Sequence, residues 1–175
     1  EYCREAINWF RNKLHKAIEE LDEQYNKFRL SDALMNLYRL FWDDFATWYL
    51  EIIKPAYQQP VDKKALETAR SFFDTLMKLL HPIMPFITEE IWQLLHERKS
   101  GESIMIAEMP RGGQYDAELL DAFDKVKALI TSVRNVRKDK YIANKEAITL
   151  KVNGNHITQY DPIIQKLANI DTIET

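Results

Sequence analysis

Residues 40–55 read L-F-W-D-D-F-A-T-W-Y-L-E-I-I-K-P, and residues 80–95 read L-H-P-I-M-P-F-I-T-E-E-I-W-Q-L-L. Apolar side chains recur in both stretches at steps of three and four residues, the periodicity of a helix that is in contact on more than one side. These positions are Phe41, Trp42, Phe45, Trp48, Tyr49, Ile52 and Ile53 in the first stretch, and Phe86, Ile87, Ile91, Leu94 and Leu95 in the second. We therefore expect both stretches to be core helices of one bundle.

The composition is that of a globular protein with a substantial core. The chain has 175 residues, of which 46% are hydrophobic and 29% are charged, and its formal net charge is -3. These proportions exclude a disordered chain. No apolar run approaches the length of a membrane span or a secretory signal, and the single cysteine, Cys3, cannot pair within the chain. We therefore expect a cytoplasmic protein that does not contact a membrane.

The spacing of apolar residues and helix breakers predicts five helices. Their approximate ranges are 4–25, 34–55, 63–80, 86–96 and 117–140. Ser31 and Asp62 are the predicted N-caps of the second and third helices. The third helix is expected to carry an apolar stripe that includes Leu66. Pro82 and Pro85 predict a sharp bend before the fourth helix, because proline lacks the amide donor and crowds the preceding turn.

The C-terminal part of the sequence has mixed character. The expected elements are a short extended stretch at 104–106, a strand at 148–152, a turn at Asn153 and Gly154, a short helix at 162–168 and a strand at 170–173. The fold class is therefore mainly α, a helical bundle with a small, truncated α/β appendage at the C-terminal end. We expect residues 1–110 to form the bundle. Residues 111–175 would form a long basic helix and a small α/β unit, the start of the following domain.

The fifth helix and the segment after it are the most basic part of the chain. Between residues 125 and 151, eight basic residues (Lys125, Lys127, Arg134, Arg137, Lys138, Lys140, Lys145 and Lys151) accompany two acidic ones, Asp139 and Glu146. The apolar line of this helix is Leu119, Phe123, Val126, Ile130 and Val133. Like charges on another face repel one another unless a polyanion or an acidic partner relieves the repulsion. We therefore predict that Arg134, Arg137 and Lys138 contact a phosphate backbone.

The order of residues is more specific than their periodicity. Residues 42–55 fit W-D-x-F-x-x-W-Y-L-E-x-x-K-P, residues 79–93 read L-L-H-P-I-M-P-F-I-T-E-E-I-W-Q, and residues 103–110 and 133–137 read S-I-M-I-A-E-M-P and V-R-N-V-R. In this order and spacing the four motifs resemble the anticodon-binding domain of the valyl-tRNA synthetase family. Met109 departs from that family, in which tryptophan is usual. Synthetases for isoleucine, leucine and methionine share the domain type, but W-Y-L-E and the His81-Pro82 step favour valine.

The resemblance implies a part of a class I synthetase that joins valine to its tRNA with ATP. The chain lacks the K-M-S-K-S and H-x-G-H signatures that adenylate chemistry requires in such enzymes. We therefore expect a piece of a longer protein that is inactive alone and has no cofactor of its own. Its partners would be the tRNA and an ATP-using catalytic domain of the same chain. With four histidines at no ligand spacing and one cysteine, a metal site is not expected.

An anticodon loop determines which side chains can read it. Its unstacked bases are read by flat side chains that stack and by amides or arginines that bond base edges, while lysine and arginine hold the phosphates. Two groups offer this mixture: Asn8, Arg11, Asn12, Lys13 and Lys16 on the first helix, and Lys54, Tyr57 and Gln58 where the second helix ends. The alternatives are the same domain of an isoleucyl-tRNA synthetase, or a helical protein-interaction module without an RNA role, which the net negative charge favours.

Overall fold

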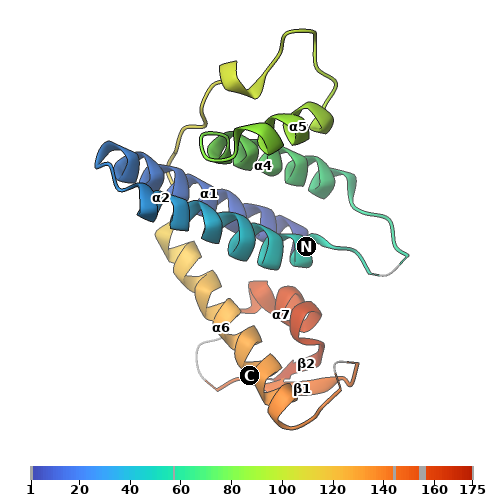
Figure 1. Cartoon of the computed structure of the whole chain (residues 1–175). Helices are drawn as coiled ribbons and strands as arrows, with labels where there is room; N and C mark the ends of the chain where they lie inside the picture. Colours follow the sequence, from blue (N-terminus) through green and yellow to red (C-terminus); the bar gives the residue numbers. More distant parts are fainter. Residues whose placement is uncertain (1, 57, 144, 154–156, 175) are drawn as a thin grey trace.

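A computed structural model describes residues 2–56, 58–143, 145–153 and 157–174 of the chain. The fold is mainly α with a small two-stranded sheet at the C-terminal end, which confirms the predicted fold class (Figure 1). The elements are α1 (Tyr2–Asn26), α2 (Leu30–Tyr38), η1 (Arg39–Tyr49), α3 (Leu50–Ile53), α4 (Lys63–Leu80), α5 (Pro85–Leu95), η2 (Ile104–Ile106), α6 (Ala117–Asp139), β1 (Ile148–Lys151), η3 (Thr158–Tyr160), α7 (Asp161–Ala168) and β2 (Ile170–Glu174). None of the helices in these described parts is both long and apolar enough to cross a membrane.

The second predicted helix is one continuous rod made of α2, the π-helical segment η1 and α3. The backbone stays right-handed helical at both joins, at Tyr38 and at Leu50. Within η1 the wider turn lets the Thr47 hydroxyl donate to the Trp42 carbonyl, five residues earlier, at 2.9 Å. The rod begins four residues before the predicted start, so Ser31 lies inside it and the prediction that Ser31 is the N-cap is wrong.

The third and fourth helices begin and end where their breakers predict. The Asp62 carboxylate accepts a hydrogen bond from the Ala65 amide at 2.7 Å, which satisfies one of the free donors at the start of α4. The chain turns after α4, and α5 packs against that helix. In the turn, His81 Nδ1 lies 2.8 Å from the hydroxyl of Thr88, which is buried. Leu66 is exposed, because α4 turns Ala65 and Ala69 inward instead.

The core forms where α1 meets both the α2–α3 rod and α4. The Phe10 ring lies at the centre, with ring centroids 5.3 Å from Phe45, 5.1 Å from Tyr49 and 5.0 Å from Phe72. Three helices therefore share one aromatic cluster. Figure 1 shows α1 lying beside the rod and α4 beside α5.

Several apolar residues of the two opening stretches are not in this core. Phe86 is 90% exposed, and Leu94 and Trp42 are also exposed. The buried side chains of α5 are Thr88 and Trp92, and α5 lies at the edge of the bundle, where it contacts α4 and η2. The expectation that these apolar positions belong to the core is therefore wrong for Trp42, Phe86, Ile87 and Leu94.

The long helix α6 connects the bundle to the α/β unit. β1 and β2 form a parallel pair in which Ile148 lies opposite Ile170, and α7 packs against α6, α3 and β2. The predicted strands and short helix are confirmed, although Gly154 of the predicted turn lies outside the described residues. The 104–106 stretch is a turn of 3₁₀-helix, not an extended segment, because the Ser103 hydroxyl caps it by accepting from the Met105 amide at 3.2 Å.

Candidate nucleic-acid interface

A groove of about 790 Å³ lies between the first half of α1 and the first turns of α4. Its lining residues are Tyr2, Cys3, Arg4, Glu5, Ile7, Asn8 and Arg11 on α1, and Asp62, Lys64 and Thr68 at the start of α4. Phe10 of α1 and Phe72 of α4 pack together with their ring centroids 5.0 Å apart, and residues of both helices line the groove. The groove therefore has a mixed lining, in which apolar side chains such as Ile7 lie beside polar and charged ones.

Two of the cationic side chains that line this groove have no partner among the residues that the structure describes. Arg11 and Lys64 are both exposed, and neither the Arg11 guanidinium nor the Lys64 ammonium forms an ion pair or hydrogen bond with another residue in the described ranges. By contrast, Arg4 pairs with Glu5 at 3.2 Å, and Asp62 is engaged as the N-cap of α4. The groove therefore offers two positive charges beside the exposed side chain of Asn8.

The five predicted residues on α1 do not form one surface. Asn12 faces α6, where its side-chain oxygen accepts from the Asp116 amide at 2.7 Å. Lys13 turns toward η1 and pairs with Asp44 at 3.5 Å. Lys16 also faces the α2–α3 rod, in a second groove of about 390 Å³ that it shares with Lys13. Neighbouring positions on a helix are about 100° apart, and only Asn8 and Arg11 of the five remain together in the first groove.

Asp44 has a structural role that sequence reasoning missed. Its side chain is buried, and Lys13 and Lys127 both approach it to 3.5 Å from α1 and α6. Burial raises the pKa of this carboxyl, and the two lysines oppose that effect. The pairing removes Lys127 from the basic face expected on the fifth helix. A carboxylate flanked by aromatics in the sequence was the available signal, but its partners are distant in sequence.

Arg137 has a structural role in this fold, and its burial argues against the predicted phosphate contact. It is only 3% exposed, and its guanidinium donates to the carbonyls of Ala168, Ala143 and Asn169 at 3.1, 3.1 and 2.6 Å. Two of these carbonyls lie at the C-terminal end of α7, where a helix leaves acceptors without internal partners. Arg137 follows Val133 by one helical turn and therefore continues the buried line of α6.

Only part of the predicted basic surface on α6 is free. Arg134 donates twice to the Leu167 carbonyl, at 3.1 and 2.9 Å, and its guanidinium lies 5.8 Å from the ring centre of Trp48. Lys138 is exposed and has no partner among the residues that the structure describes. Of the three predicted phosphate contacts on this helix, Lys138 alone is unengaged within those residues.

The predicted contacts at the end of the second helix lie near the groove. α3 ends beside the start of α1, and the loop to α4 leaves from there (Figure 1). Lys54 is exposed, with its ammonium 3.6 Å from the Glu51 carboxylate. Gln58 is exposed and has a left-handed backbone, with φ of 62°. Tyr57 lies outside the described residues, so its predicted contact stays a prediction.

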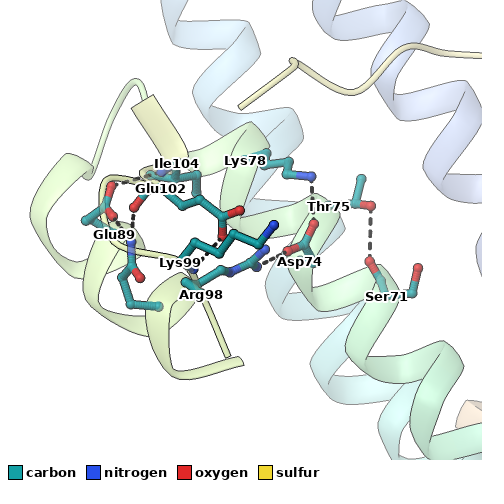
Figure 2. Close-up of polar contacts among 10 residues, drawn as sticks. Ser71, Asp74, Thr75, Lys78, Glu89, Arg98, Lys99, Glu102 and Ile104 are labelled. Atoms are coloured by element: carbon teal, nitrogen blue, oxygen red, sulfur yellow. Dashed lines mark hydrogen bonds and ion pairs between the residues drawn. The ribbon is translucent and has the colours of Figure 1, made fainter. Parts of the chain in front are cut away.

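Two further carboxylates in the bundle have structural partners. In Figure 2, Lys78 and Arg98 reach the two oxygens of Asp74, at 2.8 and 3.2 Å. Glu89 accepts from the Ser103 hydroxyl and the Ile104 amide at 2.7 and 3.1 Å and fastens the loop after α5. Hydrogen bonds from Gln93 and Ser103 lower the pKa of Glu89. Within the described ranges no three His, Cys, Asp or Glu side chains gather where they could hold a metal ion.

Comparison with known proteins gives a family match over most of the chain. The profile of the anticodon-binding domain of tRNA ligase matches residues 8–152. The chain is 49% identical to the valine–tRNA ligase of Parabacteroides distasonis over 168 residues, which are 96% of this chain and 19% of that protein. It is 47% identical to the valine–tRNA ligase of Phocaeicola vulgatus over 175 residues, 99% of this chain and 20% of that protein. Identity to the valine–tRNA ligase of Thermotoga maritima is 31% over 179 residues, with coverages of 99% and 20%.

These matches confirm the resemblance that the four sequence motifs indicated. The chain spans about one fifth of the length of the relatives it matches. The family match covers all of the helices α2 to α6 and most of α1. It therefore includes Asn8, Arg11 and Lys64, the polar residues that the groove brings together.

Proposed function

Since the chain belongs to the family of anticodon-binding domains of tRNA ligases, we propose that it binds a tRNA anticodon stem and loop in the groove between α1 and α4. The observation that carries this proposal is the pair of unengaged cations, Arg11 and Lys64, on opposite walls of that groove. Two charges held apart by rigid helices can contact phosphates on both sides of a single-stranded loop. The chain's net charge of -3 favours a local, specific contact over general affinity for nucleic acid.

Different residues of this site would have different roles. Arg11 and Asn8 carry planar groups that can bond the edges of splayed bases, whereas Lys64 acts as a point charge on phosphate. Lys54 and Gln58, with Tyr57 between them in sequence, would extend the contact along the loop before α4. Lys138 would contact the backbone of the stem. Asn12, Lys13 and Lys16 lie outside the lining of this groove and have partners within the protein, so they are weaker candidates.

For the longer protein, we propose the reaction that the names of the relatives print, the joining of valine to its tRNA. The reaction would use ATP and take place in the cytoplasm. The chemistry would lie in a catalytic domain outside these 175 residues, since the groove holds no activated nucleophile or phosphate-binding loop. The chain described here would orient the tRNA, and its partners would be that domain and the valine tRNA.

A footprint on the protein tests this site. Backbone amide resonances of the isotope-labelled chain would be followed while an RNA hairpin with the valine anticodon stem and loop is added. We expect the largest shifts at Asn8, Arg11, Lys64 and Thr68. The second groove, around Lys16 and Arg39, is the internal control and should change little. Shifts confined to the second groove or to α5, or no shifts, would overturn the proposed site.

A further inference from the structure

Lys166 of the α/β unit reaches across to the bundle at the edge of the proposed RNA site. Its ammonium donates to the carbonyl oxygens of Ile52 at 2.7 Å and Lys54 at 2.5 Å. It also lies 4.1 Å from the centre of the Tyr2 ring. One side chain from α7 therefore touches the end of α3, the first residue of the following loop and the start of α1.

Two of the three places that Lys166 touches belong to the proposed RNA site. Tyr2 lines the groove, and Lys54 opens the loop that contains Gln58 and leads to Asp62. At Lys54 the backbone leaves the helix, with ψ of 125°. The direction of the loop is set there, where Lys166 holds the carbonyl oxygen.

The chemistry of the contact favours a fixed geometry. A helix ends with carbonyls that lack internal partners, and a cation there also interacts favourably with the helix dipole. The positive charge over the Tyr2 ring adds a cation–π attraction. Burial lowers the pKa of Lys166, while Cys3 and Glu51 oppose that effect. Lys166 is thus held by acceptors, an aromatic face and partial burial at once.

We propose that Lys166 is a positioning residue for RNA recognition. It fixes Tyr2 and the loop before α4 in the geometry that the anticodon loop requires. Lys166 itself does not contact the RNA, because its ammonium is directed at protein carbonyls. The α/β unit would thereby take part in recognition without forming the binding surface. This inference rests on the proposed function of the groove.

The test compares Lys166→Met and Lys166→Arg with the unmodified chain. Methionine keeps much of the apolar length but removes the charge and all donors, whereas arginine restores both. Lys125→Met, at an exposed position on α6 without a partner in the described residues, is the matched control. Binding of the valine anticodon hairpin would be measured well below the melting temperature of each variant. Amide hydrogen exchange of residues 53–56 would be measured in the same samples.

We expect Lys166→Met to weaken hairpin binding by about tenfold and to speed exchange of residues 53–56, while Lys166→Arg recovers most of both. The control should match the unmodified chain. Unchanged affinity in folded Lys166→Met, with only a lower melting temperature, would overturn the positioning role and leave the proposed function standing. If the unmodified chain does not bind the hairpin, the proposed function itself fails. Should Lys166→Met not fold, Lys166→Gln, which keeps a shorter neutral donor, enters the same comparison with the same two outcomes.

Discussion

The rings of Trp9 and Phe123 stack with their centroids 4.3 Å apart and an angle of 17° between their planes. Trp9 belongs to α1 and Phe123 to α6, and both side chains are buried. This contact joins the predicted bundle of residues 1–110 to the region after it. The division of the chain into those two regions stays a prediction. The stacking and the Asp44 ion pairs link the two regions directly.

Trp9→Ala should be the most damaging of the tryptophan truncations within the α1 and η1 helices. Removing a fully buried aromatic side chain costs about 3–5 kcal/mol. Trp48 is half-buried, and its replacement by alanine should lower the free energy of unfolding by less. Trp42 is 57% exposed, and its replacement should lower that free energy by about 0.5 kcal/mol or less. Urea unfolding of the three variants measures the order. An equal loss at Trp42 and Trp9 would contradict the observed packing.

Asp44 gives the free energy of unfolding a distinct dependence on pH. Burial raises the pKa of Asp44 above its ordinary value of 3.8, so the folded chain keeps this proton at pH values where the unfolded chain has released it. In that window the unfolded state binds fewer protons, and the contribution of Asp44 to stability therefore falls as pH rises. We expect the difference in unfolding free energy between the unmodified chain and Asp44→Asn to fall from pH 3.8 upward and then level off. A difference that grows with pH would show that Lys13 and Lys127 outweigh burial.

Arg137→Met separates a structural role from an RNA-binding role. The substitution leaves three carbonyls without their charged donor, and we expect it to cost about 3 kcal/mol of stability. Hydrogen exchange should rise first in α7 and β2. Hairpin affinity, measured well below the melting temperature, should not change. Lys138→Met is the control, and its stability should stay within about 0.5 kcal/mol of the unmodified chain. A loss of affinity in fully folded Arg137→Met would restore Arg137 as an RNA contact.

Substitution of the two groove cations by alanine should affect RNA binding in two different ways. Arg11→Ala should weaken binding of the valine hairpin by about 1–3 kcal/mol. It should also reduce the difference in affinity between the valine hairpin and a non-cognate hairpin. Lys64→Ala should weaken both hairpins equally and reduce the salt slope by about one, since a phosphate contact carries no base information. Arg70→Ala, on α4 outside the groove, is the control. Equal behaviour of all three variants in hairpin titrations would remove Arg11 and Lys64 from the site.

Local signals in the sequence were enough for most of the fold. The Asp62 cap, the proline bend and the apolar spacing of α1 and α6 all depend on residues that are close in sequence. Each of these predictions is confirmed. Periodicity shows which residues share a face, but not whether another element covers that face. Phe86 is the clear case, because its side chain belongs to the apolar pattern of α5 but is exposed.

The candidate site was less predictable from the sequence. Whether a polar side chain is free or forms an ion pair or hydrogen bond depends on residues that are distant in sequence. Lys13 and Arg11 look alike in sequence, but Lys13 pairs with Asp44 and Arg11 does not. Arg137 lies on the buried line of α6, and that spacing was the signal that could have excluded it. Nothing near Lys166 in the sequence indicates that it reaches the carbonyls of Ile52 and Lys54.

The most direct test of the account is a titration of this chain with two RNA hairpins, one with the valine anticodon stem and loop and one with the isoleucine anticodon stem and loop. Each titration is repeated at a low and a physiological salt concentration. The account predicts tighter binding of the valine hairpin at both salt concentrations, and affinity that falls for both hairpins as salt rises. Equal affinity for the two hairpins would contradict valine specificity. Absence of salt-dependent binding to either hairpin would contradict the RNA-binding function and favour a protein-interaction module.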